Sequence, residues 1–139
     1  MGAGLCRSRG WYGVDIPVSQ QTVLLIDDCS EILEHIAEIL SLDGFRVLKA
    51  NAGEQAVHLF TACRNEIDLV VSEVMSSLYA GERTINEVRR IDKDIPVLFV
   101  TDLDAHEAPR RIGAFENYYL LNKPFYPEEL GEDIRFIIG

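Results

Sequence analysis

Positive charge is scarce in this sequence. Lysine and arginine together number 13, against 23 aspartates and glutamates, and the formal net charge at pH 7 is −10. Such a surface repels polyanions, which argues against nucleic acid or an anionic membrane as a direct partner. No hydrophobic run approaches the roughly 18 residues that span a membrane. The negative net charge is compatible with binding of a divalent cation or of a protein with a basic surface.

Cysteine is also scarce, and its pattern excludes two kinds of site. The three cysteines, Cys6, Cys29 and Cys63, are odd in number and widely spaced. Neither a disulfide framework nor a zinc site fits this spacing, so the sequence predicts free thiols in a reducing cytosol. Arg7 and Arg9 have no apolar segment behind them, so the N-terminus does not look like a secretory signal. We therefore expect a cytoplasmic protein.

Length and apolar content are those of a single folded domain. The chain has 139 residues, of which 47% are hydrophobic, enough to build a core. Residues 1–20 show neither helical nor strand periodicity and contain several glycines and a proline. We predict a loosely ordered N-terminal extension over residues 1–20 and one folded domain over residues 21–139.

Five short apolar runs alternate with five helical segments along the chain. The predicted strands are Val23–Ile26, Phe45–Ala50, Ile67–Met75, Val97–Val100 and Tyr118–Leu121. The predicted helices run from an N-cap at Ser30 to Gly44, over Ala52–Cys63, over Ile85–Arg90, weakly over Asp102–Ile112, where Pro109 interrupts, and onward from Pro127. This (βα)5 alternation predicts an α/β fold, a doubly wound parallel five-stranded sheet with helices on both faces.

Polar side chains stand at the carboxyl ends of four predicted strands. They are Asp27 and Asp28, then Glu73, Thr101 and Lys123. Ligands of open α/β sheets bind beyond these strand ends, so we expect the five residues to converge on one site. Three carboxylates repel one another, and the single lysine leaves them net negative, so Mg²⁺ would complete the neutralisation. A metal, an ammonium and a hydroxyl around a carboxylate can also hold phosphoryl oxygens.

The segments LLIDD, IDLVVSEVM, IPVLFVT and NKPFYPEEL, taken in this order, resemble the receiver domain of two-component response regulators. The resemblance covers about residues 22–138, and the interval from Thr101 to Lys123 also fits the family. It implies a CheY-like, flavodoxin-like fold with strand order 2-1-3-4-5. It also implies a signalling module of a phosphorelay, without catalytic residues and not an enzyme.

The resemblance assigns a role to each residue of the cluster. Asp27 and Asp28 would be the acidic pair that binds Mg²⁺, with Glu73 and the backbone carbonyl of Met75 as further ligands. Thr101 would be the switch hydroxyl, and Lys123 the lysine that contacts the phosphoryl group. Mg²⁺ is the one cofactor that the resemblance implies. Whether this chain has lost the ability to bind it stays open.

Glu73 is the main departure from the family pattern, because the family's phosphoacceptor is an aspartate. Glutamate is one methylene longer, so a phosphoryl group on it would lie past the positions set by Thr101, Lys123 and the metal. A misplacement on the order of 1 Å costs roughly a hundredfold in rate. The longer carboxylate also reaches partway towards the phosphoryl position and would imitate the phosphorylated state in part.

Three smaller departures concern the segments around the site. Ser76-Ser77 stand where the family usually has a proline. The aromatic switch position, three residues before the lysine, holds Leu120, so Tyr119 would take that role only through a one-residue slip. Gly113-Ala114 comes early, which predicts a remodelled region around the fourth helix.

The main hypothesis is a receiver that signals by protein–protein interaction and without phosphorylation. Its partner would be a sensor histidine kinase or a downstream effector, bound through the face made by the fourth helix, fifth strand and fifth helix. Whether the chain forms a homodimer stays open. Three alternatives remain: an ordinary Mg²⁺-dependent receiver that tolerates glutamate, a small Mg²⁺-dependent phosphohydrolase, and a structural pseudo-receiver without metal. The phosphohydrolase is disfavoured because the chain is too short for a substrate domain.

Overall fold

The computed structural model describes residues 20–74, 80–102 and 117–139. Within these ranges the chain forms one parallel five-stranded sheet in the order β2-β1-β3-β4-β5, which confirms the predicted fold class and strand order. The strands are β1 (Thr22–Ile26), β2 (Arg46–Ala50), β3 (Leu69–Val74), β4 (Val97–Thr101) and β5 (Tyr118–Asn122). The helices are α1 (Ser30–Leu42), α2 (Gly53–Cys63), α3 (Ala80–Ile91) and α5 (Pro127–Ile138).

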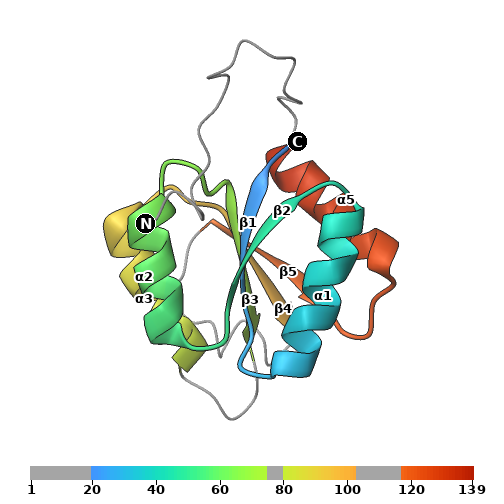
Figure 1. Ribbon diagram of the computed structural model, residues 1–139, viewed down its shortest axis with the longest axis horizontal. Helices are drawn as coiled ribbons and strands as arrows, with labels where there is room; N and C mark the ends of the chain where they lie inside the picture. The colour runs from blue at the N-terminus through green and yellow to red at the C-terminus, as the bar shows by residue number, and fades with distance from the viewer. Residues whose placement is uncertain (1–19, 75–79, 103–116) are drawn as a thin grey trace.

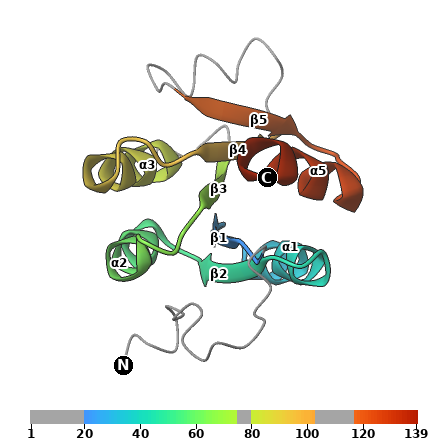
Figure 2. The same ribbon diagram turned by 90° about the horizontal axis from the view of Figure 1, so that it is seen from above.

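The sheet lies between two layers of helices. Helices α1 and α5 cover one face, and α2 and α3 cover the other (Figures 1 and 2). Each layer encloses its own hydrophobic cluster: Phe60 and Phe99 belong to the cluster under α2 and α3, and Leu40 and Leu130 to the cluster under α1 and α5. Because the central strands are buried on both faces, they require continuous apolar runs, which is the pattern that the sequence shows.

Burial follows the position of each strand in the sheet. Every residue of β1 and of β4 is buried, whereas the outer strands β2 and β5 contain half-buried and exposed residues. Residues 45–50 are more polar than the central strands, which fits the position of β2 as an outer strand. The polar ends of the buried strands therefore mark where the backbone leaves the core.

The observed helix ends agree with the predicted ends at some positions and differ from them at others. Ser30 is the first residue of α1 and not its N-cap, because Cys29 holds the extended cap conformation and no side chain caps the helix. Gly44 has a φ of 98° directly after the C-cap residue, a left-handed conformation that glycine adopts without strain. At the start of α5, the Tyr126 backbone N–H donates to Glu129 Oε1 at 2.7 Å.

Helix α3 begins earlier than the sequence predicted. It starts at Ala80 instead of Ile85, because its first turns carry few apolar residues from which a helical period could be read. Arg89 fixes its far end: the side chain donates to the Ile95 carbonyl at 3.1 Å and to the Asn117 carbonyl at 2.8 Å. Several predictions lie outside the described residues, namely the N-terminal extension up to residue 19, Ser76-Ser77, Gly113-Ala114 and the fourth helix after Asp102.

The sequence argued against a membrane-spanning helix and against a disulfide, and the described residues bear on both points. None of the described helices is long and apolar enough to cross a bilayer. Cys29 is a free thiol, as predicted. Cys63 is buried and disulfide-bonded, so the prediction of a free thiol is wrong there. Spacing along the sequence does not report which sulfur atoms meet in space.

Candidate functional site

The carboxyl ends of four strands meet at one edge of the sheet. The register places side by side Ile26 and Ser72, Glu73 and Val100, and Thr101 and Asn122. Asp27 directly follows β1, and Lys123 directly follows β5. The parallel register is thus the reason that residues up to a hundred positions apart in the sequence reach one site.

Glu73 and Lys123 form the closest contact of the cluster. The Lys123 ammonium donates a hydrogen bond to Glu73 Oε2 within an ion pair, and the side chains are only 9% (Glu73) and 24% (Lys123) exposed. The Lys123 backbone N–H donates to the Thr101 carbonyl at 2.7 Å, and the Lys123–Pro124 peptide bond is cis. The glutamate therefore engages the lysine ammonium directly.

Asp27 is buried beside this ion pair, with 4% of the residue exposed. The pKa of Asp27 is raised from its usual 3.8 to about 7, chiefly by burial and further by a hydrogen bond with the Glu73 carboxyl group and by the charge of that group. The Cys29 backbone N–H, which donates to Asp27 Oδ1 at 2.9 Å, and the Lys123 charge lower it. Near neutral pH a large fraction of Asp27 therefore carries a proton that it can donate to Glu73.

The other predicted site residues differ in their surroundings. Asp28, next to Asp27 in sequence, is exposed. Thr101 is fully buried at the end of β4. Tyr119 is 42% exposed on β5, and its proposed switch role stays a prediction. Met75 lies outside the described residues.

Tyr118 is a packing residue. Its ring meets Phe99 edge-to-face with the centroids 5.7 Å apart, and it packs against the cluster under α2 and α3. Leu120, which stands at the family's aromatic switch position, packs against the same cluster. Alternation along β5 puts Tyr119 on the opposite face of the sheet from these two side chains.

Ser72 is a feature of the site that sequence reasoning missed. It is 1% exposed, and its hydroxyl has no hydrogen-bond partner in the described structure. A buried hydroxyl without a partner costs free energy, so it is an unusual residue directly before Glu73. The signal was present in the sequence, because Ser72 is the one polar residue between Leu69 and Glu73.

The carboxylates match the oxygen donors that Mg²⁺ prefers, but their arrangement is not that of a closed ligand set. Among residues 20–74, 80–102 and 117–139, no three His, Cys, Asp or Glu side chains are grouped so as to hold a metal ion. Asp28 is exposed, and Glu73 is already engaged by Lys123 and Asp27. The expected set of Asp27, Asp28 and Glu73 therefore stays a prediction.

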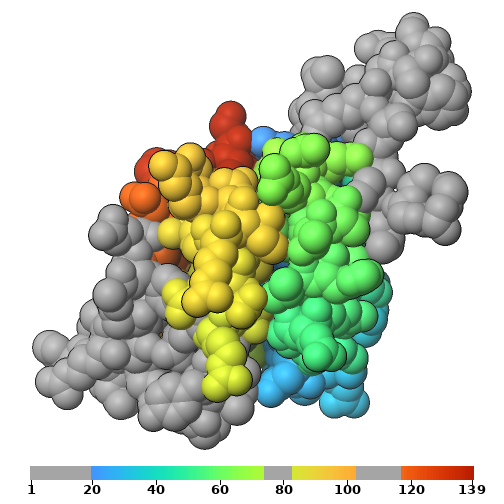
Figure 3. Space-filling view, turned by 90° about the vertical axis from the view of Figure 1, so that its left-hand side faces the viewer, coloured from blue at the N-terminus to red at the C-terminus, as the bar shows by residue number. Residues whose placement is uncertain are grey.

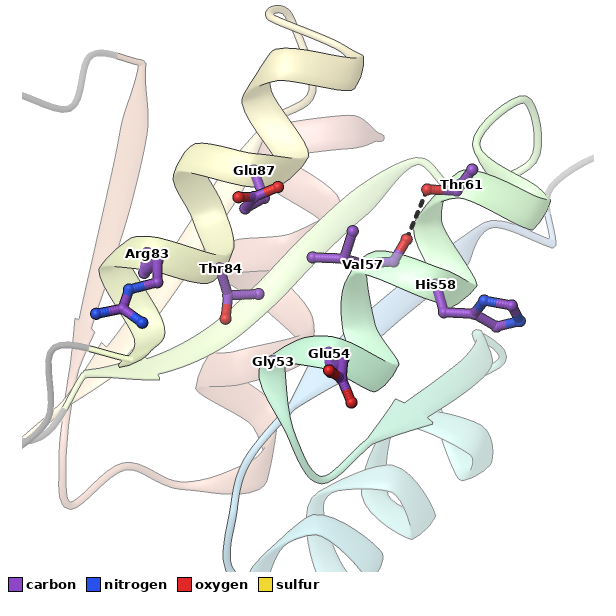
Figure 4. Close-up of a pocket in the computed structure, with 8 residues that line it drawn as sticks. All are labelled: Gly53, Glu54, Val57, His58, Thr61, Arg83, Thr84 and Glu87. Atoms are coloured by element: carbon purple, nitrogen blue, oxygen red, sulfur yellow. Dashed lines mark hydrogen bonds between the residues drawn. The ribbon is translucent and has the colours of Figure 1, made fainter.

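A groove lies apart from the strand-end cluster, between α2 and α3, which run side by side on one face (Figure 3). It has a volume of about 720 Å³. Its lining, shown in Figure 4, consists of Gly53, Glu54, Val57, His58, Thr61, Arg83, Thr84 and Glu87. The His58 ring is directed away from α3 (Figure 4), and the residue is exposed. No predicted site residue lines this groove.

Comparison with known proteins gives consistent matches. Residues 23–135 match the response regulator receiver domain. The transcriptional regulatory protein CpxR of Klebsiella pneumoniae is 34% identical over 119 residues, which cover 84% of this chain and 48% of that protein. The probable transcriptional regulator ycf27 of Guillardia theta is 31% identical, covering 86% of this chain and 46% of that protein. The chain thus spans about half the length of these curated relatives.

A solved structure agrees with the sequence matches. The chemotaxis protein CheY4 of Vibrio cholerae superposes with a TM-score of 0.76 at 26% identity, covering 86% of this chain and 99% of that one. The sheet order, the strand-end cluster and these similarities agree. The chain belongs to the family of response regulator receiver domains.

Proposed function

We propose that this chain is a receiver domain that signals without phosphorylation, because Glu73 occupies the acceptor position and is paired with Lys123. The observation that carries the proposal is the direct Glu73–Lys123 ion pair. A phosphoryl group on Glu73 would have to displace this contact and would lie one methylene beyond the reach of an aspartyl phosphate. Since phosphoryl transfer depends on positioning and on charges placed in advance, both effects slow it.

The same ion pair supports an active-like resting state. A carboxylate that already holds the lysine supplies part of the negative charge that a phosphoryl group would bring. Asp27 adds a hydrogen bond to Glu73 and so helps to fix its position. The domain would then present one conformation to its partner, independent of a phosphodonor.

Magnesium remains part of the proposal. Asp27 and Asp28, with Glu73 and the Met75 carbonyl, are the groups that would hold the ion, and the ion would add positive charge beside the acceptor position. Receiver domains are in general signalling modules without enzymatic activity, and we propose the same for this chain. The cytoplasmic location also stays a proposal, since the disulfide at Cys63 removes the cysteine argument for it.

The proposed partner is a protein, either a sensor histidine kinase or a downstream effector. In the described residues, the face expected to bind it comprises β5 and α5, and the fourth helix lies outside these residues. Two of the large exposed hydrophobic side chains, Tyr119 and Phe136, belong to these two elements. A homodimer through the same face is the competing arrangement.

The test is phosphorylation by a small-molecule donor. The purified chain is incubated with Mg²⁺ and acetyl phosphate, and its intact mass is measured at once under mild conditions. We expect no adduct on the wild type and an adduct on Glu73→Asp, whose shorter side chain restores the geometry of an aspartate acceptor. An adduct on the wild type that is lost in Glu73→Gln would overturn the proposal and favour an ordinary receiver that tolerates glutamate.

A further inference from the structure

Helix α2 ends at Cys63, which is buried and disulfide-bonded. The chain has three cysteines, and Cys29 is a free thiol. Cys6 is therefore the cysteine of this chain that remains to pair with Cys63. It belongs to residues 1–19, which lie outside the described residues. A bond between Cys6 and Cys63 would fasten this N-terminal segment to the end of α2.

The groove between α2 and α3 runs back along α2 from this cysteine. Its α2 wall includes Thr61, Val57 and Gly53, which precede Cys63 by two, six and ten residues. Because a helix rises about 1.5 Å per residue, the farthest of these lies about 15 Å from Cys63. The groove volume of about 720 Å³ lies within the roughly 300–1,000 Å³ of ligand pockets, so large side chains fit in it.

The N-terminal segment carries large side chains shortly after Cys6. Trp11 and Tyr12 follow it by five and six residues. An extended chain covers at least about 3.3 Å per residue, so five residues reach about 17 Å, which is as far as the far end of the groove. Both side chains are aromatic and gain from burial against an apolar wall. Once Cys6 is bonded to Cys63, these two rings can therefore reach any part of the α2 wall.

The start of β1, where the N-terminal segment joins the sheet, lies at the same end of the sheet as Cys63. Asp68 follows Cys63 by five residues, and its backbone N–H donates to the Thr22 carbonyl at 2.8 Å. The Thr22 backbone N–H in turn donates to the Asp68 carboxylate at 2.8 Å. The residues between Cys6 and Gln20 span about 40 Å when extended. This length is enough for the segment to enter the groove and return to β1.

The charges of the groove and of the N-terminal segment are opposite in sign. Glu54 on α2 and Glu87 on α3 are exposed acids of the two walls, and the Arg83 guanidinium is directed away from α2 (Figure 4). Residues 1–20 contain two arginines, Arg7 and Arg9, and a single acid. They are thus a basic segment in a chain whose net charge is −10. This complementarity favours the segment as the occupant of the groove.

We propose that Cys6 is the disulfide partner of Cys63 and that residues 7–12 dock in the groove between α2 and α3. Trp11 packs against the half-buried Val57, and the two arginines lie along the acids of the walls. Forming the bond oxidises the two thiols and reduces one small-molecule disulfide to two thiols, which take up the two electrons and two protons. So short a contact depends on the covalent link to hold. The groove is therefore covered in an oxidising thiol pool and open in a reducing one, independently of phosphorylation.

The experiment uses Trp11, the single tryptophan of the chain, as the probe. The full chain is equilibrated with oxidised or with reduced glutathione. Free thiols are counted by mass after alkylation in denaturant, and tryptophan emission and acrylamide quenching are read on the same samples. In the oxidised sample we expect a monomer with one free thiol, at Cys29, and with emission at shorter wavelength and weaker quenching than in the reduced sample. Cys6→Ser should show the emission of the reduced sample under both conditions, whereas the control Cys29→Ser should behave as the wild type.

Groove variants separate docking from the disulfide itself. Val57→Lys puts a charge of the same sign as the segment's arginines into the groove, so it should move the emission to longer wavelength while the disulfide stays intact. Ile32→Lys makes the same kind of change on α1, where the side chain is 37% exposed, and should leave the emission unchanged. A bond from Cys63 to Cys29 or to a second chain, or three free thiols in the oxidised sample, would overturn the proposal. An emission that either Cys6→Ser or Val57→Lys leaves unchanged would overturn it as well.

Discussion

The raised pKa of Asp27 makes the stability of this domain depend on pH. In the folded protein the pKa is about 7, against a usual value of 3.8. Between these values the folded protein retains a proton that the unfolded chain has released, so the free energy of unfolding falls as pH rises. The Asp27 contribution is fully present below about pH 4 and is lost by about pH 7. A shift of this size corresponds to an upper limit on the order of 4 kcal/mol.

Asp27→Asn isolates this contribution, because asparagine resembles the protonated aspartate and can still donate to Glu73. We expect the variant to match the wild type near pH 4.5 and to be more stable by a few kcal/mol at pH 8. Urea unfolding followed by circular dichroism, repeated in steps between these pH values with a chelator present, measures the difference. The matched control is Asp28→Asn, which makes the same chemical change at the neighbouring exposed position.

The reasoning is refuted if the free energies of unfolding of the wild type and Asp27→Asn change with pH along parallel curves. If the wild type and Asp27→Asn lost stability equally from pH 4.5 to pH 8, Asp27 would be ionised in the folded protein throughout. Glu73→Gln gives a second check, because Glu73 raises the Asp27 pKa both by its hydrogen bond and by its charge. The pH dependence of that variant should be shallower than that of the wild type.

Three further predictions follow from particular contacts. Gly53→Ala should destabilise the domain by about 1–3 kcal/mol in urea unfolding, because a Cβ there would overlap Thr84 Oγ1, and added Thr84→Ala should recover most of the loss. Ser72→Ala should stabilise it by about 1 kcal/mol, because the buried hydroxyl has no described partner, and a loss of stability would show that it has one. Lys123→Met should raise the Asp27 pKa, read by carboxyl carbon titration, because Lys123 lowers it; an unchanged pKa would contradict the arrangement.

The sequence by itself determined the architecture. Continuous apolar runs, set between segments with a helical period, predicted a parallel sheet between two helical layers, and the register confirms it. Polar residues that end buried strands marked the site, because a charge can follow such a strand only where the chain leaves the core. Asp27, Glu73, Thr101 and Lys123 were found in this way.

Tertiary structure decided between residues that the local sequence pattern does not distinguish. Asp27 and Asp28 are neighbours of identical chemistry, yet one is 4% exposed and the other is exposed, because only the assembled sheet fixes which carboxylate it desolvates. The contact between Glu73 and Lys123 joins residues 50 positions apart and depends on the places of β3 and β5 in the sheet. Apolar periodicity records which face of a segment is buried, but the charges and hydrogen bonds that surround a buried group come from other strands.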